Sequence, residues 1–333
     1  MVNKSNKMLK VCKFGIRVIL AGLAIAATIL LFKIRLWPFE LFHHFALHFF
    51  LLTGLLLVAC LIFRAKMEVV LFSSLFFIFG VSLWSAYGAP RVSQDLITKL
   101  PNNYQKKFFM ITLISHNIQD VNEHHQELGL WLQGQPADIV LLQEVPSRIA
   151  AWYREKSIYP YQLEVYDPAL NHPNFPDNKA IVILSKYLVS ENLEFKPFKD
   201  SRPVPIVRIC IPNAQNPWVA IFDAPEPKTA KRLGQRDRLL IGAAKRISEL
   251  SGPVVVVGDF NATPLTPTFN DFLKIADVSA SRFYIPTFPS ILKWLGIPID
   301  HILVRNIRVK RVNALPAIGS DHRPLKAELL LPG

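Results

Sequence analysis

The chain has 333 residues, enough for a large folded domain and a membrane anchor, and 51% of them are hydrophobic, more than in an ordinary soluble domain. Residues 1–107 carry a net charge of +10 and the remainder only +3, so the charge does not indicate a protein that binds long nucleic acids. Cys210 is the single cysteine after residue 60, which excludes a disulfide within the second part of the chain.

Three apolar runs near the beginning of the chain predict transmembrane helices at about residues 14–32, 39–63 and 67–88. Each run has about the ~20 residues that a helix needs to cross the hydrocarbon layer, and Trp37 and Trp84 lie near the ends, where such aromatics favour the headgroup zone. The first run could also be a signal peptide, but its length and the two runs that follow favour a retained helix. We therefore expect membrane lipid to surround this part of the chain.

Basic residues around these runs predict the orientation of the protein. The tail before the first run and the break at Arg64 and Lys66 would lie on one side, and this side has more Lys and Arg than the other. The richer side is expected to face the cytoplasm. Three crossings then place everything after residue 90 outside the cytoplasm.

Three histidines, His43, His44 and His48, lie in the second run. His44 and His48 are four residues apart, which is a spacing that two metal ligands on one helical face can have. The alternative is that these rings make polar contacts between helices or near a helix end. We favour the polar contacts.

A predicted linker at residues 90–107 separates the apolar runs from a region in which strand and helix patterns alternate. The mixed order, with hairpin-like pairs between helical crossovers, predicts two packed sheets covered by helices. The predicted strands are residues 108–117, 138–143, 181–184, 204–211, 218–222, 253–257, 299–304 and 325–331, and the predicted helices are residues 121–133 and 228–250.

Polar clusters follow several of these apolar strands, where a rigid scaffold presents reactive groups. Each cluster alone has an ordinary explanation, such as a turn, a helix cap or a surface ion pair. Their joint presence in one chain is more specific. The clusters are Ser115-His116-Asn117, Gln143-Glu144, Gly258-Asp259-Phe260-Asn261, Ile299-Asp300-His301 and Ser320-Asp321-His322.

The residue types in these clusters suit metal-assisted hydrolysis of a phosphate ester. Mg²⁺ prefers oxygen ligands, and Glu144, Asp259 and Asp321 supply carboxylates. His322 is a candidate general base for a water that attacks phosphorus, and Asp300 is the candidate carboxylate that orients its imidazole.

The clusters resemble, in order, the motifs of the endonuclease/exonuclease/phosphatase superfamily over about residues 108–333. The resemblance implies a four-layer α/β sandwich, that is, two packed mixed β-sheets flanked by helices, and a Mg²⁺ or Mn²⁺ ion. It implies that Glu144, Asp321 and Asn117 bind this ion. It also implies that Asp259 and Asn261 align the nucleophile or the phosphate. His322 is then the base or a phosphate-contacting imidazole paired with Asp300, and the short helical anchor is typical of a protein of the bacterial inner membrane.

Two positions depart from the superfamily pattern. Many hydrolytic members carry a His at the end of the strand before the long helix, and Phe222 stands at that position here, with Asp223 beside it. A Phe cannot donate a proton or bind phosphate, so we expect Asp223, or a loop residue such as Tyr166 or His172, to take this role, or activity to be reduced or lost. Lys179-Ala180 stands where the superfamily usually has a Gly.

Three alternative functions are compatible with these residues. The first is a membrane-anchored phosphoesterase acting on a phosphorylated small molecule or lipid, with specificity set by loops at residues 166–178 and 263–288. The second is an anchored nuclease, with nucleic acid as a less favoured partner. The third is a non-catalytic protein that binds a phosphorylated ligand, which Phe222 would explain. A basic face for the nuclease could come from Arg232, Arg236, Arg238, Lys245 and Arg246, although these residues are also ordinary solvated helix charges.

Overall fold

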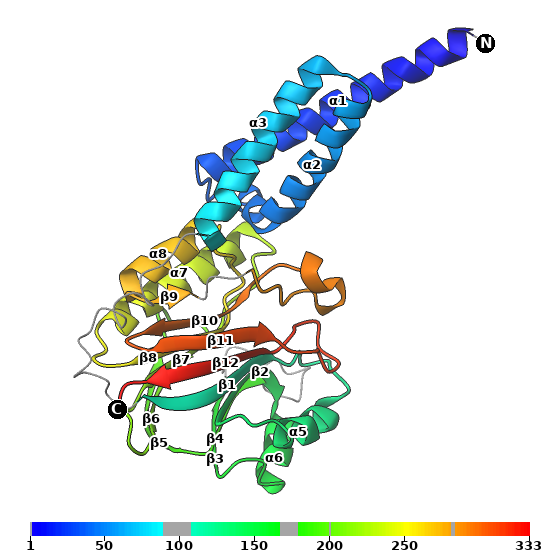
Figure 1. Ribbon diagram of the computed structural model, residues 1–333. Helices are drawn as coiled ribbons and strands as arrows, with labels where there is room; N and C mark the ends of the chain where they lie inside the picture. Colours follow the sequence, from blue (N-terminus) through cyan, green and yellow to red (C-terminus); the bar gives the residue numbers. More distant parts are fainter. Residues whose placement is uncertain (1, 89–107, 167–178, 200, 281–283) are drawn as a thin grey trace. The chain divides into compact units, whose positions relative to one another are not determined.

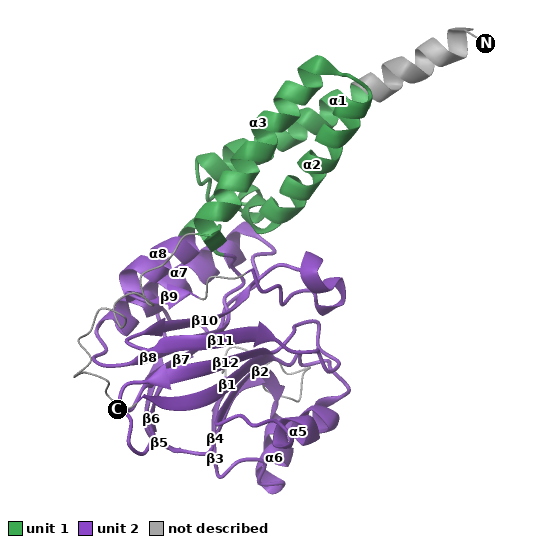
Figure 2. Cartoon of the chain, viewed as in Figure 1, with its two compact units in different colours: residues 1–89, 264–267 green, residues 90–263, 268–333 purple. Residues whose placement is uncertain are grey.

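A computed structural model describes residues 2–88, 108–166, 179–199, 201–280 and 284–333 (Figure 1). The chain forms two compact units, which are Met1–Ala89 with Pro264–Pro267, and Pro90–Thr263 with Thr268–Gly333 (Figure 2). The predicted linker at residues 90–107 lies outside the described residues. His172 and most of the predicted loop at residues 166–178 also lie outside them.

Helices make up the N-terminal part of the first unit. They are α1 (Val2–Leu31), α2 (Ala46–Ile62), which follows the 3₁₀ turn η1 (Phe39–Phe45), and α3 (Lys66–Leu83), which continues into η2 (Trp84–Gly88). Three segments are long and apolar enough to cross a membrane, namely Phe14–Leu31, Phe39–Ile62 and Lys66–Gly88. They agree with the three predicted spans and suggest membrane association.

Both the interior and the exterior of this unit are apolar. Small and aromatic side chains such as Ala26, Ala46 and Phe79 are buried where the helices meet. Large apolar side chains such as Leu55 and Phe77 are exposed on the outside. A helix that is apolar on all sides is stable next to lipid and unstable in water, so the packing supports the same interpretation as the hydropathy.

The histidines of the second span make polar contacts within this unit. Nε2 of His43 lies 3.0 Å from the carbonyl oxygen of Ile34, and Nε2 of His44 lies 3.8 Å from a carboxylate oxygen of Glu40. Among the described residues, no ion-sized cluster of three ligand atoms includes His44 or His48. The polar-contact interpretation is therefore the one that the structure supports.

The second unit contains two six-stranded sheets. The strands are β1 (Phe109–Asn117), β2 (Ile139–Pro146), β3 (Tyr161–Tyr166), β4 (Lys179–Ser185), β5 (Leu188–Phe195), β6 (Val204–Cys210), β7 (Trp218–Asp223), β8 (Val254–Asp259), β9 (Ser279–Ala280), β10 (Asp300–Arg305), β11 (Arg308–Ala314) and β12 (Leu325–Leu331). Their order is β11-β12-β1-β2-β4-β3 in the first sheet and β5-β6-β7-β8-β10-β9 in the second. The pairs β1–β2 and β7–β8 are parallel and the others are antiparallel, so both sheets are mixed.

Helices cover the outer faces of the two sheets (Figure 1). They are α5 (His125–Gln133) and α6 (Ser147–Glu155) on the first sheet, and α7 (Ala230–Ser248) and α8 (Pro267–Ala276) on the second. One apolar cluster fills the space between the sheets, and two others lie between a sheet and its helices. This is a four-layer α/β sandwich, which confirms the predicted fold class.

Two predicted elements differ from the structure. The helix expected from residue 121 begins at His125, because Asn122 forms a turn in which its Oδ1 accepts a hydrogen bond of 2.8 Å from the backbone N–H of His124. The region 263–288, predicted as a specificity loop, instead contains α8 and the short strand β9.

The strand connections bring the predicted catalytic clusters to one edge of the sandwich. The parallel strands β1 and β2 end near each other, and so do β7 and β8. Asp300 begins the antiparallel strand β10 opposite Asp259, the last residue of β8. Leu325 begins β12 opposite Ser115 of β1, so the residues just before it lie at the same edge.

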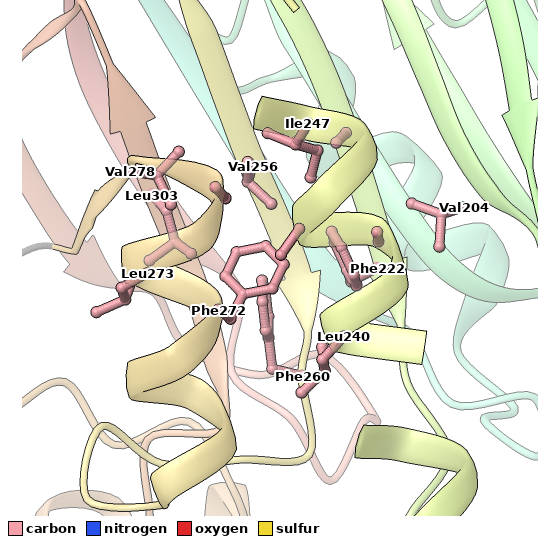
Figure 3. Close-up of a cluster of buried hydrophobic side chains, with 14 of the residues drawn as sticks. Val204, Phe222, Leu240, Ile247, Val256, Phe260, Phe272, Leu273, Val278 and Leu303 are labelled. Atoms are coloured by element: carbon pink, nitrogen blue, oxygen red, sulfur yellow. The ribbon is translucent and has the colours of Figure 1, made fainter. Parts of the chain in front are cut away.

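Alternation along β7 decides which side chains face the inside of the sandwich. Val219 and Ile221 point between the sheets, whereas Ala220 and Phe222 point towards the helices. Phe222 is fully buried there, and its ring stacks on that of Phe260 at 4.6 Å (Figure 3). Phe222 therefore faces the helix layer and not the cleft, so the aromatic ring itself takes no part in the candidate site.

Gly258 is required by the close approach of β7 and β8. Its φ is +120°, and a Cβ atom at this position would lie 2.1 Å from the carbonyl oxygen of Phe222. We expect Gly258→Ala to cost about 3 kcal/mol or more through backbone strain and this clash, which lowers the melting temperature by roughly 6–12 °C.

Gly234→Ala is the matched control, because nothing lies within 4 Å of a Cβ atom at this position of α7. It should raise stability by about 0.5–1 kcal/mol. Thermal unfolding of the full chain in detergent measures both variants. An unchanged melting temperature for Gly258→Ala would contradict the close approach of the two strands.

Candidate functional site

A cleft of about 380 Å³ lies at the edge of the sandwich where the strands end. It is lined by six of the predicted site residues, namely Asn117, Glu144, Asp259, Asn261, Asp321 and His322. The seventh, Asp300, is buried and contacts the cleft through His322. The structure therefore brings together all the residues that the sequence predicted for the site.

His322 and Asp300 form a buried pair. Nδ1 of His322 lies 2.8 Å from Oδ2 of Asp300, which leaves Nε2 facing Asp259, whose Oδ2 is 4.0 Å away. The position of the ring is fixed further by Phe288, whose ring centre is 5.0 Å from it. The backbone N–H of His322 also donates a hydrogen bond of 3.0 Å to Oγ of Ser320. The imidazole thus has one oriented nitrogen and one nitrogen that is available to the cleft.

The carboxylates around His322 favour its protonated form. Burial alone would lower its pKa, but Asp300 with its hydrogen bond, and then Asp259 and Asp321, raise the pKa of His322 to about 10. The pKa of Asp300 is lowered, because the attraction and the hydrogen bond of His322 outweigh the effect of burial. In the protein without bound cations, His322 is therefore an imidazolium at neutral pH.

This raised pKa predicts the ionisation of His322 in the presence of chelator. Because its pKa is raised, His322 keeps its proton when the pH exceeds 6.5, the ordinary pKa of histidine, and releases it only as the pH rises towards 10. In full-length protein with ¹³C-labelled histidine, the Cε1 resonance of His322, assigned by its loss in His322→Gln, should keep its imidazolium position at pH 8. A midpoint near 6.5 would contradict the pair with Asp300.

Asp259 and Asn261 are locked together by a tight turn after β8. Oδ1 of Asp259 accepts the backbone N–H of Asn261 at 2.8 Å, and Oδ2 accepts Nδ2 of Asn261 at 3.0 Å. Asn261 has a φ of 47°, a left-handed conformation that Asn adopts more readily than most residues. The pKa of Asp259 is raised, first by burial and then by the neighbouring charge of Asp300.

Arg236 stabilises this turn by a hydrogen bond to its backbone, a role that the sequence did not predict. Its side chain is fully buried in α7, Nη1 donates a hydrogen bond of 2.9 Å to the carbonyl oxygen of Asn261, and Nη2 lies 2.7 Å from Oδ1 of Asp237. Arg236 was expected to contribute to an exposed basic face. That expectation is wrong, and the candidate nucleic-acid surface loses one of its five cations.

Glu144 reaches the cleft because β2 is irregular there. The pairing of β2 with β4 shifts between Leu142 and Val145, and Glu144 itself has a φ of 56°. Its Oε1 accepts a hydrogen bond of 3.1 Å from Nδ2 of Asn117, and its Oε2 lies 3.0 Å from Nζ of Lys179. Burial raises the pKa of Glu144, but Lys179 and Asn117 lower it below its ordinary value overall.

The model of the Endonuclease/Exonuclease/phosphatase family matches residues 114–322, more than half of the chain. The chain belongs to the endonuclease/exonuclease/phosphatase family. The match begins within β1 and ends at His322, so it contains all seven predicted site residues.

Solved structures of the endonuclease/exonuclease/phosphatase fold resemble this chain. A family member from Beutenbergia cavernae DSM 12333 has a TM-score of 0.55 at 15% identity and covers 67% of this chain and 72% of its own. The mannosyl-6-phosphatase of Bacteroides thetaiotaomicron VPI-5482 has a TM-score of 0.52 at 16% identity, over 66% and 99% of the two chains. TDP2 of D. rerio, complexed with single-strand DNA product, has a TM-score of 0.51 at 15% identity, over 66% and 98%. These likenesses show the shared fold.

The donor groups of the cleft fit the divalent cation that the endonuclease/exonuclease/phosphatase family implies. Ligand atoms of Asp259, Asp300 and His322 lie within 4.8 Å of one another, but two of them are already bonded in the His322–Asp300 pair. The carboxylates of Glu144 and Asp321 line the same cleft and provide the oxygen atoms that Mg²⁺ and Mn²⁺ prefer. We therefore regard these two carboxylates as the better ligands.

Asn117 makes hydrogen bonds to the two carboxylates beside it in the cleft. Its Nδ2 points to Oε1 of Glu144 at 3.1 Å and to Oδ2 of Asp259 at 3.4 Å, and its Oδ1 accepts the backbone N–H of Gln119 at 3.1 Å. As a hydrogen-bond donor, Asn117 holds the two carboxylates at a fixed spacing. To bind a cation itself, it would have to turn its oxygen towards the ion.

Other cleft residues gave no catalytic signal in the sequence. Lys179, noted only as a departure from the superfamily pattern, forms ion pairs with Glu144 and with Asp120, whose Oδ2 is 2.8 Å away. Arg202 follows a polar stretch without a motif and pairs with Asp223, which takes the cleft-facing position at the end of β7. Of the two proposed substitutes that the structure describes, Asp223 and Tyr166, Asp223 lines the cleft.

Proposed function

We propose that this chain is a membrane-anchored, divalent-cation-dependent phosphoesterase that hydrolyses a phosphate ester. The observation that carries the proposal is the buried His322–Asp300 pair, whose free imidazole nitrogen faces Asp259 in a cleft shared with Glu144 and Asp321. Carboxylates for a cation and an oriented imidazole are the groups that phosphoester hydrolysis needs.

The chain's own residues would divide the work as follows. Asp259 and Asn261 orient the attacking water or a phosphoryl oxygen from their rigid turn. His322, held by Asp300, contacts the phosphoryl group as an imidazolium or accepts the proton of the water as a neutral imidazole. A Mg²⁺ or Mn²⁺ ion on Glu144 and Asp321 would neutralise phosphoryl charge and disfavour the imidazolium form of His322.

The lining of the cleft favours a small phosphorylated group over a nucleic acid. Lys179, Arg202, Lys228 and Arg232 place cations beside the carboxylates, which suits a compact anion. Two solved structures of the same fold are a mannosyl-6-phosphatase and TDP2 complexed with single-strand DNA product. The burial of Arg236 weakens the nuclease alternative, and the joint presence of Glu144, Asp259 and His322 in the cleft argues against a non-catalytic protein.

A membrane anchor formed by the three apolar segments would hold this activity at a membrane. With three spans and the basic tail in the cytoplasm, the catalytic unit would face the extracytoplasmic side of a bacterial inner membrane. A phosphorylated lipid is then an accessible substrate. Labelling of an introduced cysteine in the catalytic unit with a membrane-impermeant maleimide, in intact cells, tests this side.

The test is phosphate or alcohol release by the full-length chain in lipid nanodiscs. The panel holds a lipid phosphate, a lipid pyrophosphate, a sphingomyelin-like diester, inositol phosphates and abasic DNA, each with Mg²⁺, Mn²⁺ or chelator. We expect cation-dependent turnover of a phosphate ester that is lost in Glu144→Ala and His322→Ala. Turnover of DNA alone would establish the nuclease, and a folded chain with no turnover would overturn the proposal.

A further inference from the structure

A short turn beside the cleft exposes a concentration of apolar side chains. This turn, η6 (Ser290–Leu295), presents Ile291, Leu292 and Trp294 with 83%, 45% and 66% of their surfaces exposed. Three large apolar side chains within four residues form a patch, whereas single exposed apolar residues are ordinary on soluble surfaces. The turn projects from the sheets as an orange loop (Figure 1).

The turn is held in shape and is connected to the catalytic residues. The backbone N–H of Ser290 donates a hydrogen bond of 2.7 Å to the carbonyl oxygen of Asp321, and the Oγ–H of Ser290 donates one of 2.9 Å to the carbonyl oxygen of Ser320. Before the turn, Phe288 lines the cleft and packs on His322, and it pairs with Ile297 after the turn. The patch therefore has a fixed position at the mouth of the cleft.

The composition of the turn suits a lipid surface. Residues 284–297 contain one charged side chain, Lys293, and no acid, so nothing in this stretch repels anionic headgroups. Tryptophan and lysine are residues that favour the membrane interface, with the apolar body in the acyl boundary and the polar group at the headgroups. The same chain carries three segments long and apolar enough to cross a membrane, so a protein anchored by them would meet a bilayer surface.

We propose that the turn at residues 290–295 inserts into the surface of the membrane and presents the mouth of the cleft to lipid headgroups. This contact does not depend on catalysis. A consequence, which does rest on the proposed function, is that the scissile phosphate belongs to a lipid headgroup.

Site-specific labelling tests the contact. Full-length protein in which Cys12, Cys60 and Cys210 are replaced by serine would carry Ile291→Cys with an environment-sensitive fluorophore, in vesicles with anionic phospholipid. Nitroxide-labelled lipids should quench this label by about half or more, and aqueous iodide should quench it weakly. The control is Leu130→Cys, an apolar position of α5 that is 61% exposed and lies far along the chain from the turn.

Each labelling outcome either supports or contradicts the contact between the turn and the membrane. Strong lipid quenching at residue 291 and iodide quenching at residue 130 support it. Equal behaviour of the two labels, or a label at residue 291 that neither quencher reaches, would overturn it, and the second result would indicate a protein partner or a second copy of this chain.

The consequence for the substrate is tested with two phosphates that share a headgroup, a long-chain phosphatidate in vesicles and sn-glycerol 3-phosphate in solution. Ile291→Ser with Trp294→Ser should lower kcat/KM for the lipid by about tenfold or more, since each side chain loses apolar burial. Turnover of the soluble ester should be unchanged. Equal losses, or turnover of soluble esters alone, would overturn a headgroup substrate. No turnover of any phosphate ester of the panel by the unsubstituted chain would indicate failure of the proposed function and leave the labelling result intact.

Discussion

His322→Gln is expected to lower kcat by about a thousandfold, within the range that a general acid or base contributes. The glutamine fits the space, but its amide can neither accept the proton of the attacking water nor pair as a cation with a phosphoryl oxygen. Its substrate is the phosphate ester of the panel that the unsubstituted chain turns over. Because the imidazole acts on the reacting group, KM should change much less than kcat.

Asp300→Asn separates orientation from proton transfer. The amide keeps the size of the side chain but removes the charge that holds Nδ1 of His322 at 2.8 Å. We expect kcat to fall by about a hundredfold and the dependence of kcat on pH to shift to lower values, because the imidazolium loses its main stabilising partner.

His124→Gln is the matched control for the histidine substitution. His124 is exposed and pairs with Glu127 at 3.0 Å on the surface of the catalytic unit, outside the cleft. Its kcat should equal that of the unsubstituted chain. If folded His322→Gln keeps more than about a tenth of the activity, then His322 is neither the base nor the phosphate contact, since either role is worth more than tenfold.

The central strands could be predicted from the sequence, but the edge strands could not. Strands such as β1 and β8 are buried on both faces and therefore appear as continuous apolar runs. The strands that the sequence did not reveal, β3, β5, β9 and β11, are the four edges of the two sheets. An edge strand such as Leu188–Phe195 is exposed along much of its length and carries charges, so it lacks the apolar pattern of a strand.

The candidate site shows a similar division. Motif residues at strand ends could be predicted because the parallel pairs carry their ends to a common edge. The direction of each side chain could not be predicted at irregular positions. At the end of β7, for example, alternation turns Asp223, and not Phe222, into the cleft. Lys179 and Arg202 were missed because a cation that pairs across strands leaves no local pattern.

The Lys179–Glu144 pair gives the last prediction its physical basis. Nζ of Lys179 lies 3.0 Å from Oε2 of Glu144 and 2.8 Å from Oδ2 of Asp120, so one ammonium pairs with two carboxylates of the cleft. A divalent cation that binds Glu144 must displace this ammonium or bind beside it. Either way the lysine opposes the ion, because like charges a few ångströms apart repel even in a medium of moderate dielectric constant.

Opposite changes in cation affinity are therefore expected from the two partners. Glu144→Gln removes a ligand charge and leaves Lys179 nearby, so it should weaken Mn²⁺ binding by about a hundredfold or more. Lys179→Met removes the competing charge and frees two carboxylates, so it should strengthen Mn²⁺ binding by about tenfold. Free Mn²⁺, measured by electron paramagnetic resonance on the full chain in detergent, reports both dissociation constants without relying on turnover.

Lys156→Met controls for the loss of one positive charge, because Lys156 is exposed and lies 3.8 Å from the exposed Glu155 rather than in the cleft. Its Mn²⁺ affinity should match that of the unsubstituted chain. Weaker binding in Lys179→Met would mean that the lysine holds Glu144 in its binding position instead of competing with the ion. Unchanged binding in Glu144→Gln would place the cation elsewhere, on Asp259 and its neighbours, because the structure groups those ligand atoms within 4.8 Å.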